Sequence, residues 1–341
     1  MTLAAKHATD VGLVAQAMRD ARRITAICHE NPDADTIGAA VAVSLMAERL
    51  GAETEIVSAD GFPPAFGFLP GADRVRRRPE LAPDLAVICD AATLERVGRI
   101  ATEEAEWFAG ARILNVDHHI SSSYYGHLNL VDPAAAATCQ VLAGLVDALG
   151  IELDAALATA LLTGIVRDSQ GFSDKATTGE TLRIAARLVD AGAPIDLVNR
   201  RVLSELPFPT IALWGKMLAR VGEDSDQRIV HASLTLAMLD ETGTQQHDAD
   251  GLAEFLARAK GADVTLLLRE LGPAETRVSV RTTDAVDATA IAGQFGGGGH
   301  VRRAGCTVPR HLDEAVELVL KASRDALNGD AGTGEVPPDG G

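Results

Sequence analysis

The chain has few aromatic residues, no paired cysteines and a deficit of positive charge. Aromatic residues make up 4% of the 341 positions, so aliphatic residues must form the core. The four cysteines (Cys28, Cys89, Cys139 and Cys306) lie far apart without a C-x-x-C pair, which favours free thiols in a reducing, cytoplasmic setting. The formal net charge of −17 argues against a protein that binds long duplex nucleic acid through a basic surface.

The sequence also lacks the patterns of a membrane span, a secretory leader or an internal repeat. The longest apolar helix-like run, residues 155–166, is too short to cross a bilayer. The first residues do not show the charged-then-apolar pattern of a signal peptide. We therefore expect no membrane partner.

The first part of the chain alternates between strand-like and helix-like runs. Short apolar runs indicate strands at 24–28, 56–58, 85–89, 112–116 and 128–131. Helical spacing of apolar residues predicts helices at 36–50, 134–149, 154–166 and 178–190. This alternation predicts an α/β fold in which residues 1–192 form a mainly parallel sheet flanked by helices on both faces.

The pattern changes after residue 192. Two helical stretches, 195–203 and 210–221, predict a helical connector over residues 193–222. A second series of strands and helices over 223–328 predicts a smaller α/β domain. Its expected strands are 228–234, 264–268 and 277–281, and its expected helices are 252–259, 288–295 and 312–327. Residues 329–341 are rich in glycine, proline and acidic residues, which predicts a disordered tail.

Three of the strand-like runs end in carboxylate or imidazole side chains. These side chains are His29, with Asp33 and Asp35 in the turn after it, then Asp90, and then Asp117, His118 and His119. In an open α/β sheet the carboxyl ends of the strands form the ligand crevice. Oxygen and nitrogen donors that converge there predict a divalent metal site, with more than one ion.

Each of these carboxylates also has a plain structural interpretation. Asp33, Asp35 and Asp90 can each cap a helix that follows a strand. Asp168 ends an apolar helical run and, taken alone, fits a surface residue at a helix end. In the functional interpretation, Asp90 bridges two ions that lie about 3.5–4 Å apart.

Asp117, His118 and His119, which follow the strand-like run 112–116, can each have a different role. Asp117 can orient a neighbouring imidazole. His118 would then bind a metal ion, and His119 would contact a phosphoryl oxygen or the leaving group. The alternative is that both histidines are solvated loop residues.

A run of glycines, residues 296–299, lies inside the second predicted domain. Such a run lets backbone N–H groups approach a phosphate without interference from side chains. The expected substrate contacts are Gly297, Gly298, Gly299, His300, Arg302 and, at a strand end, Arg281. A flexible loop and a solvated strand end are the structural alternatives.

The order of these motifs resembles that of the DHH phosphoesterase family, and the C-terminal part resembles its DHH-associated domain. The resemblance extends from about residue 24 to residue 327, and the two-domain length is similar to that of the NrnA-like subgroup. It implies a metal-dependent phosphoesterase with two divalent ions, foremost Mn²⁺, with Mg²⁺ or Co²⁺ as alternatives.

The resemblance also implies which residues hold the ions and the substrate. One ion would be held by His29, Asp33 and Asp90, and the other by Asp35, Asp90, His118 and Asp168. His119 would face the substrate, and the glycine run with His300 would hold its nucleotide end.

The substrates that the resemblance implies are very short RNA (nanoRNA), 3′-phosphoadenosine 5′-phosphate (pAp) and linear or cyclic dinucleotides such as pApA and c-di-AMP, with mononucleotides as products. Two alternatives stay open: a manganese-dependent pyrophosphatase or polyphosphatase, and a non-catalytic nucleic-acid-binding module. A homodimer would fit either enzyme.

Three positions depart from the family pattern. Ala34 stands where glycine is more frequent, and we expect it to be tolerated if its φ is negative. Ser169-Gln170 replaces the more frequent Thr-Gly, which changes the loop after Asp168. Arg303 stands where a small residue is usual, and could alter which nucleotide is preferred.

Overall fold

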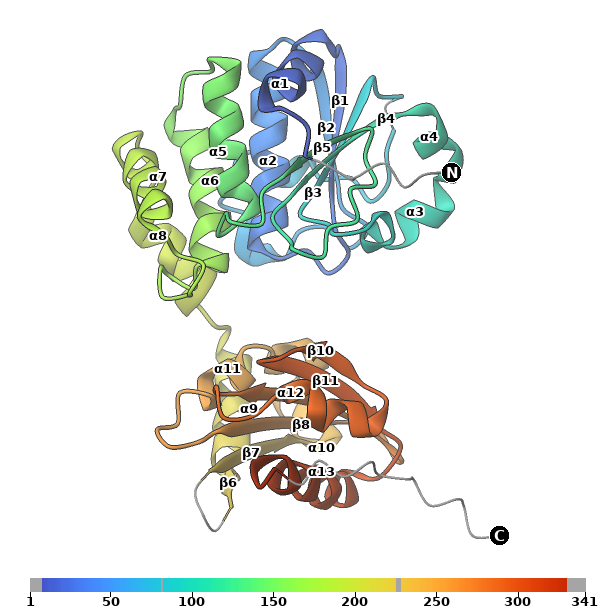
Figure 1. Ribbon diagram of the computed structural model, residues 1–341, viewed down its shortest axis with the longest axis vertical. Helices are drawn as coiled ribbons and strands as arrows, with labels where there is room; N and C mark the ends of the chain where they lie inside the picture. Colours follow the sequence, from blue (N-terminus) through green and yellow to red (C-terminus); the bar gives the residue numbers. More distant parts are fainter. Residues whose placement is uncertain (1–7, 81, 225–227, 330–341) are drawn as a thin grey trace. The chain divides into compact units, whose positions relative to one another are not determined.

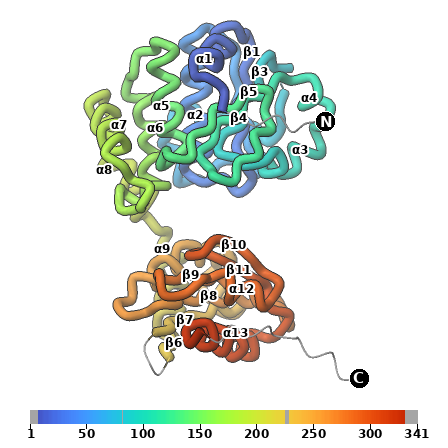
Figure 2. The backbone as a smooth tube through the Cα atoms, viewed as in Figure 1, coloured from blue at the N-terminus to red at the C-terminus, as the bar shows by residue number. Residues whose placement is uncertain are grey.

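The computed structural model describes residues 8–80, 82–224 and 228–329, which form two compact units. The units are Met1–Glu205 and Leu206–Gly341, and the chain passes between them once (Figure 2). The predicted connector 193–222 is thus divided, because Val198 packs in the core of the first unit and Leu213 in a core of the second. Of the predicted tail, all residues after 329 lie outside the described ranges.

The first unit contains a five-stranded sheet in which all neighbouring strands are parallel (Figure 1). In spatial order the strands are β2 (Glu53–Val57), β1 (Arg23–Cys28), β3 (Leu85–Cys89), β4 (Arg112–Asp117) and β5 (Leu128–Val131). The strand order reverses at β1, which lies between β2 and β3. Such a reversal opens a crevice at the carboxyl ends of β1 and β3.

Helices cover both faces of this sheet, as the alternation of runs predicts. The larger core lies under α1 (Val11–Asp20), α2 (Ala34–Arg49), α5 (Thr138–Leu149) and α6 (Ala155–Asp168). The smaller core lies under α3 (Arg99–Glu103) and α4 (Ala105–Gly110). Helices α7 (Gly179–Asp190) and α8 (Ile195–Asn199) pack beside α6. Short 3-10 or π turns occur at Pro64–Phe66, Ala72–Arg74, Leu94–Val97 and Arg200–Ser204.

The second unit contains a six-stranded mixed sheet. In spatial order its strands are β10 (Gly298–His300), β11 (Arg303–Val308), β9 (Glu275–Thr282), β8 (Val264–Gly272), β7 (Ile229–Leu234) and β6 (Gly222–Glu223). Only the β7–β8 pair is parallel among these described neighbours. β10 and β11 were not predicted; for β10 the reason is that glycine has a low strand propensity.

Helices pack on both faces of this sheet, and on one face they leave part of the surface open. α12 (Ala288–Ala292) and α13 (Leu312–Leu327) pack on one face. On the opposite face, α9 (Phe208–Leu218), α10 (Leu236–Thr242) and α11 (Leu252–Leu256) pack over β7 and β8. The same face of β9 and β11 borders a groove beside 3-10 turn η6 (Gly293–Phe295).

Candidate active site

The predicted metal ligands of the first unit converge on the crevice at the strand ends. His29 follows β1, Asp90 follows β3, and His118 follows β4. Asp35 comes from the first turn of α2, and Asp168 is the last residue of α6. Five elements therefore deliver these side chains to one place.

One group of donors consists of His29, Asp33 and Asp90, whose ligand atoms all lie within 4.8 Å of one another. The Nε2 atom of His29 lies 3.7 Å from Oδ1 of Asp33 and 3.6 Å from Oδ2 of Asp90. This is the set that the family resemblance assigns to one ion.

A second group consists of Asp35, His118 and Asp168, with the same mutual spacing. The Nε2 atom of His118 lies 3.1 Å from Oδ2 of Asp168 and 3.6 Å from Oδ1 of Asp90. Asp90 thus presents one oxygen to each group, which is the position that a bridging carboxylate needs.

Both histidines are held in the orientation typical of metal ligands. The Nδ1 atom of His29 lies 2.7 Å from the carbonyl oxygen of Glu30, and that of His118 lies 3.2 Å from the carbonyl oxygen of Ala135. A carbonyl only accepts, so Nδ1 must carry the hydrogen and Nε2 is left with a lone pair toward the carboxylates.

Asp117 and His119 form a pair beside these groups, and Nδ1 of His119 lies 3.6 Å from Oδ1 of Asp90. Asp117 is fully buried, and its Oδ1 lies 2.6 Å from Nδ1 of His119. The same oxygen accepts the backbone N–H groups of His118 (2.9 Å) and His119 (3.2 Å). The His119 side chain is 44% exposed, so its Nε2 edge is accessible while Asp117 fixes the ring.

Asp33 caps a helix, as the structural interpretation of the sequence predicts. Its Oδ1 caps α2 by accepting the N–H groups of Asp35 (3.0 Å) and Thr36 (3.3 Å). The cap fixes the carboxylate beside His29, so capping and metal binding do not exclude each other.

Two threonines that the sequence analysis missed hold the ligands in place. Thr138 donates its hydroxyl to Oδ1 of Asp90 (2.9 Å) and its N–H to Oδ2 of Asp35 (2.6 Å). Thr36 donates its hydroxyl to the carbonyl of Cys89 (2.8 Å) and accepts the N–H of His29 (3.3 Å). Both threonines are fully buried.

The carboxylate of Asp35 replaces a local cap for α5. The expected helix start at residue 134 is wrong, because α5 begins at Thr138. Ala137, at the N-cap position, has no side chain that could cap the helix. Instead Asp35 accepts N–H groups from Thr138 and, at 3.0 Å, from Cys139. A Cβ at Gly164 of α6 would lie 2.2 Å from Oδ1 of Asp35, so only glycine lets α6 approach this closely.

Backbone strain is concentrated at the site. Asp90 has a φ of +60° and Asn31 a φ of +50°, and Gln170 and Phe172 in the loop after Asp168 also have positive φ. Non-glycine residues in this region are uncommon and cluster at functional sites. Ala34 is not among the positive-φ residues, so its presence in place of the usual glycine is tolerated, as expected.

The electrostatics of the crevice favour bound cations. Burial raises the pKa of Asp35 well above its usual value, and the nearby charges of Asp90 and Asp168 raise it further. Burial likewise raises the pKa of Asp168. Burial lowers the pKa of His29, but its contacts with Asp33 and Asp90 outweigh this and raise it to about 10. The carboxylates thus draw positive charge into the crevice, which a bound cation would supply in place of protons, and hard oxygen donors with two imidazoles suit Mn²⁺ or Mg²⁺.

The substrate contacts expected in the second unit are only partly brought together. Gly297, Gly298 and Arg281 line the groove beside η6. Gly299 and His300 belong to β10 and are exposed. The N–H of Gly297 donates to the carbonyl of Ala292 (3.0 Å), so it is not free for a phosphate.

The two arginines after the glycine run have different surroundings. Arg302 lies in the turn between β10 and β11, where its guanidinium bonds to Asp284 and to the carbonyls of Thr283 and Val286. Arg303, the next residue, lines the groove instead. Of these two arginines, Arg303 lines the groove and Arg302 does not.

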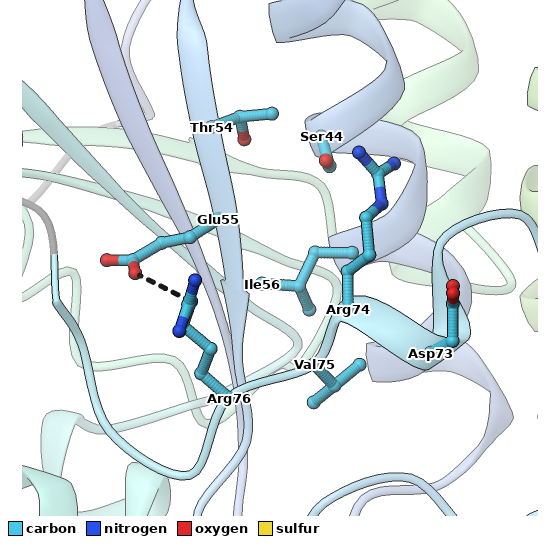
Figure 3. Close-up of a pocket in the computed structure, with 8 residues that line it drawn as sticks. All are labelled: Ser44, Thr54, Glu55, Ile56, Asp73, Arg74, Val75 and Arg76. Atoms are coloured by element: carbon cyan, nitrogen blue, oxygen red, sulfur yellow. Dashed lines mark ion pairs between the residues drawn. The ribbon is translucent and has the colours of Figure 1, made fainter.

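A second pocket in the first unit lies away from these groups. Figure 3 shows it between α2, the edge strand β2 and the segment Asp73–Arg76. Its Arg76 forms ion pairs with Glu55 (3.9 Å) and Glu80 (2.6 Å). Within the described ranges none of the predicted metal ligands lines this pocket.

The same ranges contain no helix with both the length and the apolar composition of a bilayer span.

Comparisons with known proteins agree with the site. Residues 23–165 match the model of the DHH family, N-terminal domain, and residues 226–329 match that of the DHHA1 domain. The chain is 35% identical over 303 residues, 88% of each chain, to the bifunctional oligoribonuclease and PAP phosphatase NrnA of Thermus thermophilus. The chain belongs to the NrnA-like DHH phosphoesterases.

Other relatives support the same assignment. The NrnA of Bacillus subtilis is 25% identical over 284 residues, which cover 82% of this chain and 87% of that protein. The crystal structure of an exopolyphosphatase-related protein from Bacteroides fragilis superposes with a TM-score of 0.83 over 93% of this chain and 96% of that one. At 20% identity this likeness shows the fold alone. DHH phosphoesterases are metal-dependent hydrolases of phosphoester bonds, and this chain is one of them.

Proposed function

We propose that the protein hydrolyses short oligoribonucleotides and pAp, and releases mononucleotides. The observation that carries this proposal is the pair of donor groups that meet at Asp90. The likeness to two NrnA proteins, whose names state oligoribonuclease and PAP phosphatase activity, indicates the substrate class. Linear dinucleotides such as pApA are the shortest RNA of this class, and cyclic dinucleotides such as c-di-AMP are a further candidate.

Two divalent ions, foremost Mn²⁺, fit the crevice. His29, Asp33 and Asp90 would hold one, and Asp35, Asp90, His118 and Asp168 the other. When bound, such ions make a water more acidic and offset negative charge on the phosphoryl oxygens.

The protein's own residues contribute orientation and a proton. Asp117 holds the His119 ring through Nδ1, which leaves Nε2 to donate a proton to the leaving oxygen or a hydrogen bond to the phosphoryl group. The buried carboxylates keep bulk water from competing for the ligand positions, because Asp35 and Asp90 are 0% and 4% exposed.

In the second unit, we assign binding of the nucleotide end to the groove beside η6. Arg281 and Arg303 supply positive charge there, and Gly297 and Gly298 form part of the lining without side chains. His300 and Gly299 lie on the adjacent strand and remain candidate contacts.

A panel of substrates with added Mn²⁺ tests the proposal. Purified protein should release mononucleotides from a 5′-phosphorylated RNA pentamer, pApA and pAp, and chelation of the metal should abolish turnover. c-di-AMP and inorganic pyrophosphate complete the panel. Faster turnover of pyrophosphate than of every nucleotide would replace the proposal by a pyrophosphatase.

A further inference from the structure

The segment between β4 and β5 folds back over the end of β4. The N–H of Ser122 donates to the carbonyl of His119 (3.1 Å), which closes a turn, and the N–H of Ser123 donates to the carbonyl of Ala92 (2.8 Å). Serine is frequent in turns because its hydroxyl can bond to nearby polar groups. The turn carries the Ser122 side chain back to β4, and the residue is only 9% exposed there.

Two polar side chains of β4 lie on the face that Ser122 meets. Asn115 and Asp117 are two residues apart on the strand, so they share a face of the sheet. Both are fully buried. Nδ2 of Asn115 donates to Oγ of Ser122 at 3.2 Å. This bond occupies a lone pair of the serine oxygen, so the hydroxyl hydrogen is left for another acceptor.

Asp117 has an oxygen that needs such a hydrogen. Its Oδ1 accepts three N–H groups, two from the backbone and one from the His119 ring. Its Oδ2 is buried and has no hydrogen-bond partner within residues 8–80, 82–224 and 228–329. A buried carboxylate oxygen without a donor is costly, so a donor close to it gains more than one elsewhere.

Ser122 is the hydroxyl that meets this requirement. Burial raises the pKa of Asp117, but its contacts with His119 and, to a smaller extent, with Ser122 lower it below its usual value. Oδ1 of Asn115 also lacks a partner in the part of the chain that the structure describes. As a neutral oxygen it is the weaker acceptor, because bonds to ionised groups are about twice as strong.

We propose that Ser122 is a positioning residue for His119 and acts on it through Asp117. The Ser122 hydroxyl donates to Oδ2 of Asp117, and Asn115 holds that hydroxyl from its other side. With both oxygens held, the carboxylate does not rotate, and the His119 ring keeps Nε2 toward the substrate. This inference deepens the proposed function and rests on it for the role of His119.

The alternative is that Ser122 only closes the turn. That role uses the backbone N–H of Ser122 and does not depend on its hydroxyl. Ser122→Ala keeps the N–H and removes the hydroxyl, so this variant separates the two roles. Ser121→Ala, at the exposed neighbouring position of the same segment, is the matched control.

The first measurement does not depend on catalysis. In the full chain labelled with ¹⁵N-histidine, and loaded with Mg²⁺ because Mn²⁺ is paramagnetic, the Nδ1–H proton of His119 is assigned by its loss in His119→Gln. We expect Ser122→Ala to make exchange of this proton with water about 10-fold faster, the scale of one hydrogen bond to a charged group. Ser121→Ala should leave the exchange rate unchanged.

The second measurement is a double-mutant cycle on the hydrolysis of pApA with Mn²⁺. Ser122→Ala should lower kcat about 10-fold and leave KM unchanged. In the His119→Gln background the same change should lower kcat by about two-fold or less, because the residue through which Ser122 acts is already absent. A role in packing alone would give equal losses in both backgrounds.

Each outcome supports or overturns the proposal. An unchanged exchange rate, an unchanged kcat in Ser122→Ala, or equal losses of kcat in the two backgrounds would overturn the positioning role. If the wild-type protein hydrolyses no nucleotide but the exchange rate of the His119 proton depends on the Ser122 hydroxyl, the proposed function fails while the contact between Ser122 and Asp117 stands.

Discussion

The crevice of the first unit and the groove of the second unit are built in opposite ways. In the crevice, Asp35, Asp90 and Asp117 are at most 4% exposed, and each is held by hydrogen bonds from other residues. In the groove, Arg277 and Arg303 are exposed and unpaired within the described residues. Several contacts thus fix each side chain of the crevice, whereas substitution of a groove arginine should cost little stability.

This difference predicts how each region responds to substitution. A change in the crevice should affect metal binding and catalysis together, and often stability. A change in the groove should affect substrate affinity and leave stability nearly unaltered.

The largest effect should come from Asp90. Removal of its carboxylate should lower kcat by on the order of 10⁴-fold, because both donor groups lose a shared member. Because Asp90 has a φ of +60°, a substitution there also changes the backbone strain, and this effect can be measured apart from the loss of the carboxylate. Asp90→Gly should be more stable than Asp90→Ala by about 1 kcal/mol, because alanine is strained in the left-handed region. Kinetics and urea unfolding measure the two effects, and an active Asp90→Gly variant would refute the assignment.

A smaller effect is expected for Thr138. Thr138→Val keeps the shape of the side chain but removes the hydroxyl that donates to Asp90. We expect Mn²⁺ affinity to fall roughly 10- to 100-fold, as for other residues that orient metal ligands. Thr138→Ser, which keeps the hydroxyl, should restore most of this affinity in a calorimetric titration. Equal losses in both variants would mean that packing, not the hydrogen bond, matters.

The smallest effect is expected for Glu254 in the groove. Glu254→Gln removes the negative charge that offsets Arg281. The KM for the RNA pentamer should fall by about three-fold, the scale of one partly exposed ion pair, with kcat unchanged. Added salt should reduce the difference. A higher KM would show instead that Glu254 positions Arg281 for the substrate.

The donor side chains that meet in the crevice could be predicted because their signals are local. β1, β3 and β4 are buried apolar runs, and polar residues follow each run directly. His29, Asp90 and His118 therefore stand out in the sequence. The family resemblance added Asp168, which follows no strand.

Thr138 could not be predicted, because its partners are distant in the chain. It lies 48 residues from Asp90 and 103 from Asp35. The alanines before it favour a helix by propensity, and this moved the expected helix start to residue 134. Only the tertiary contact with Asp35 explains why α5 begins where it does.

The sequence singled out the glycine run but not its structure. No strand was predicted at residues 296–299, yet Gly298–His300 pairs with β11 as a strand. Strand pairing also decides which arginine faces the groove, since a shift of one residue exchanges the faces. Arg303 faces the groove for this reason, and Arg302 does not.

The central claim is that Asp90 joins two cation sites at the carboxyl end of the first sheet. Anomalous diffraction from a crystal soaked in Mn²⁺ tests it most directly. The account predicts two peaks about 3.5–4 Å apart, one beside His29 and Asp33 and one beside His118 and Asp168, with Asp90 between them. A single peak, or peaks away from these side chains, would contradict it.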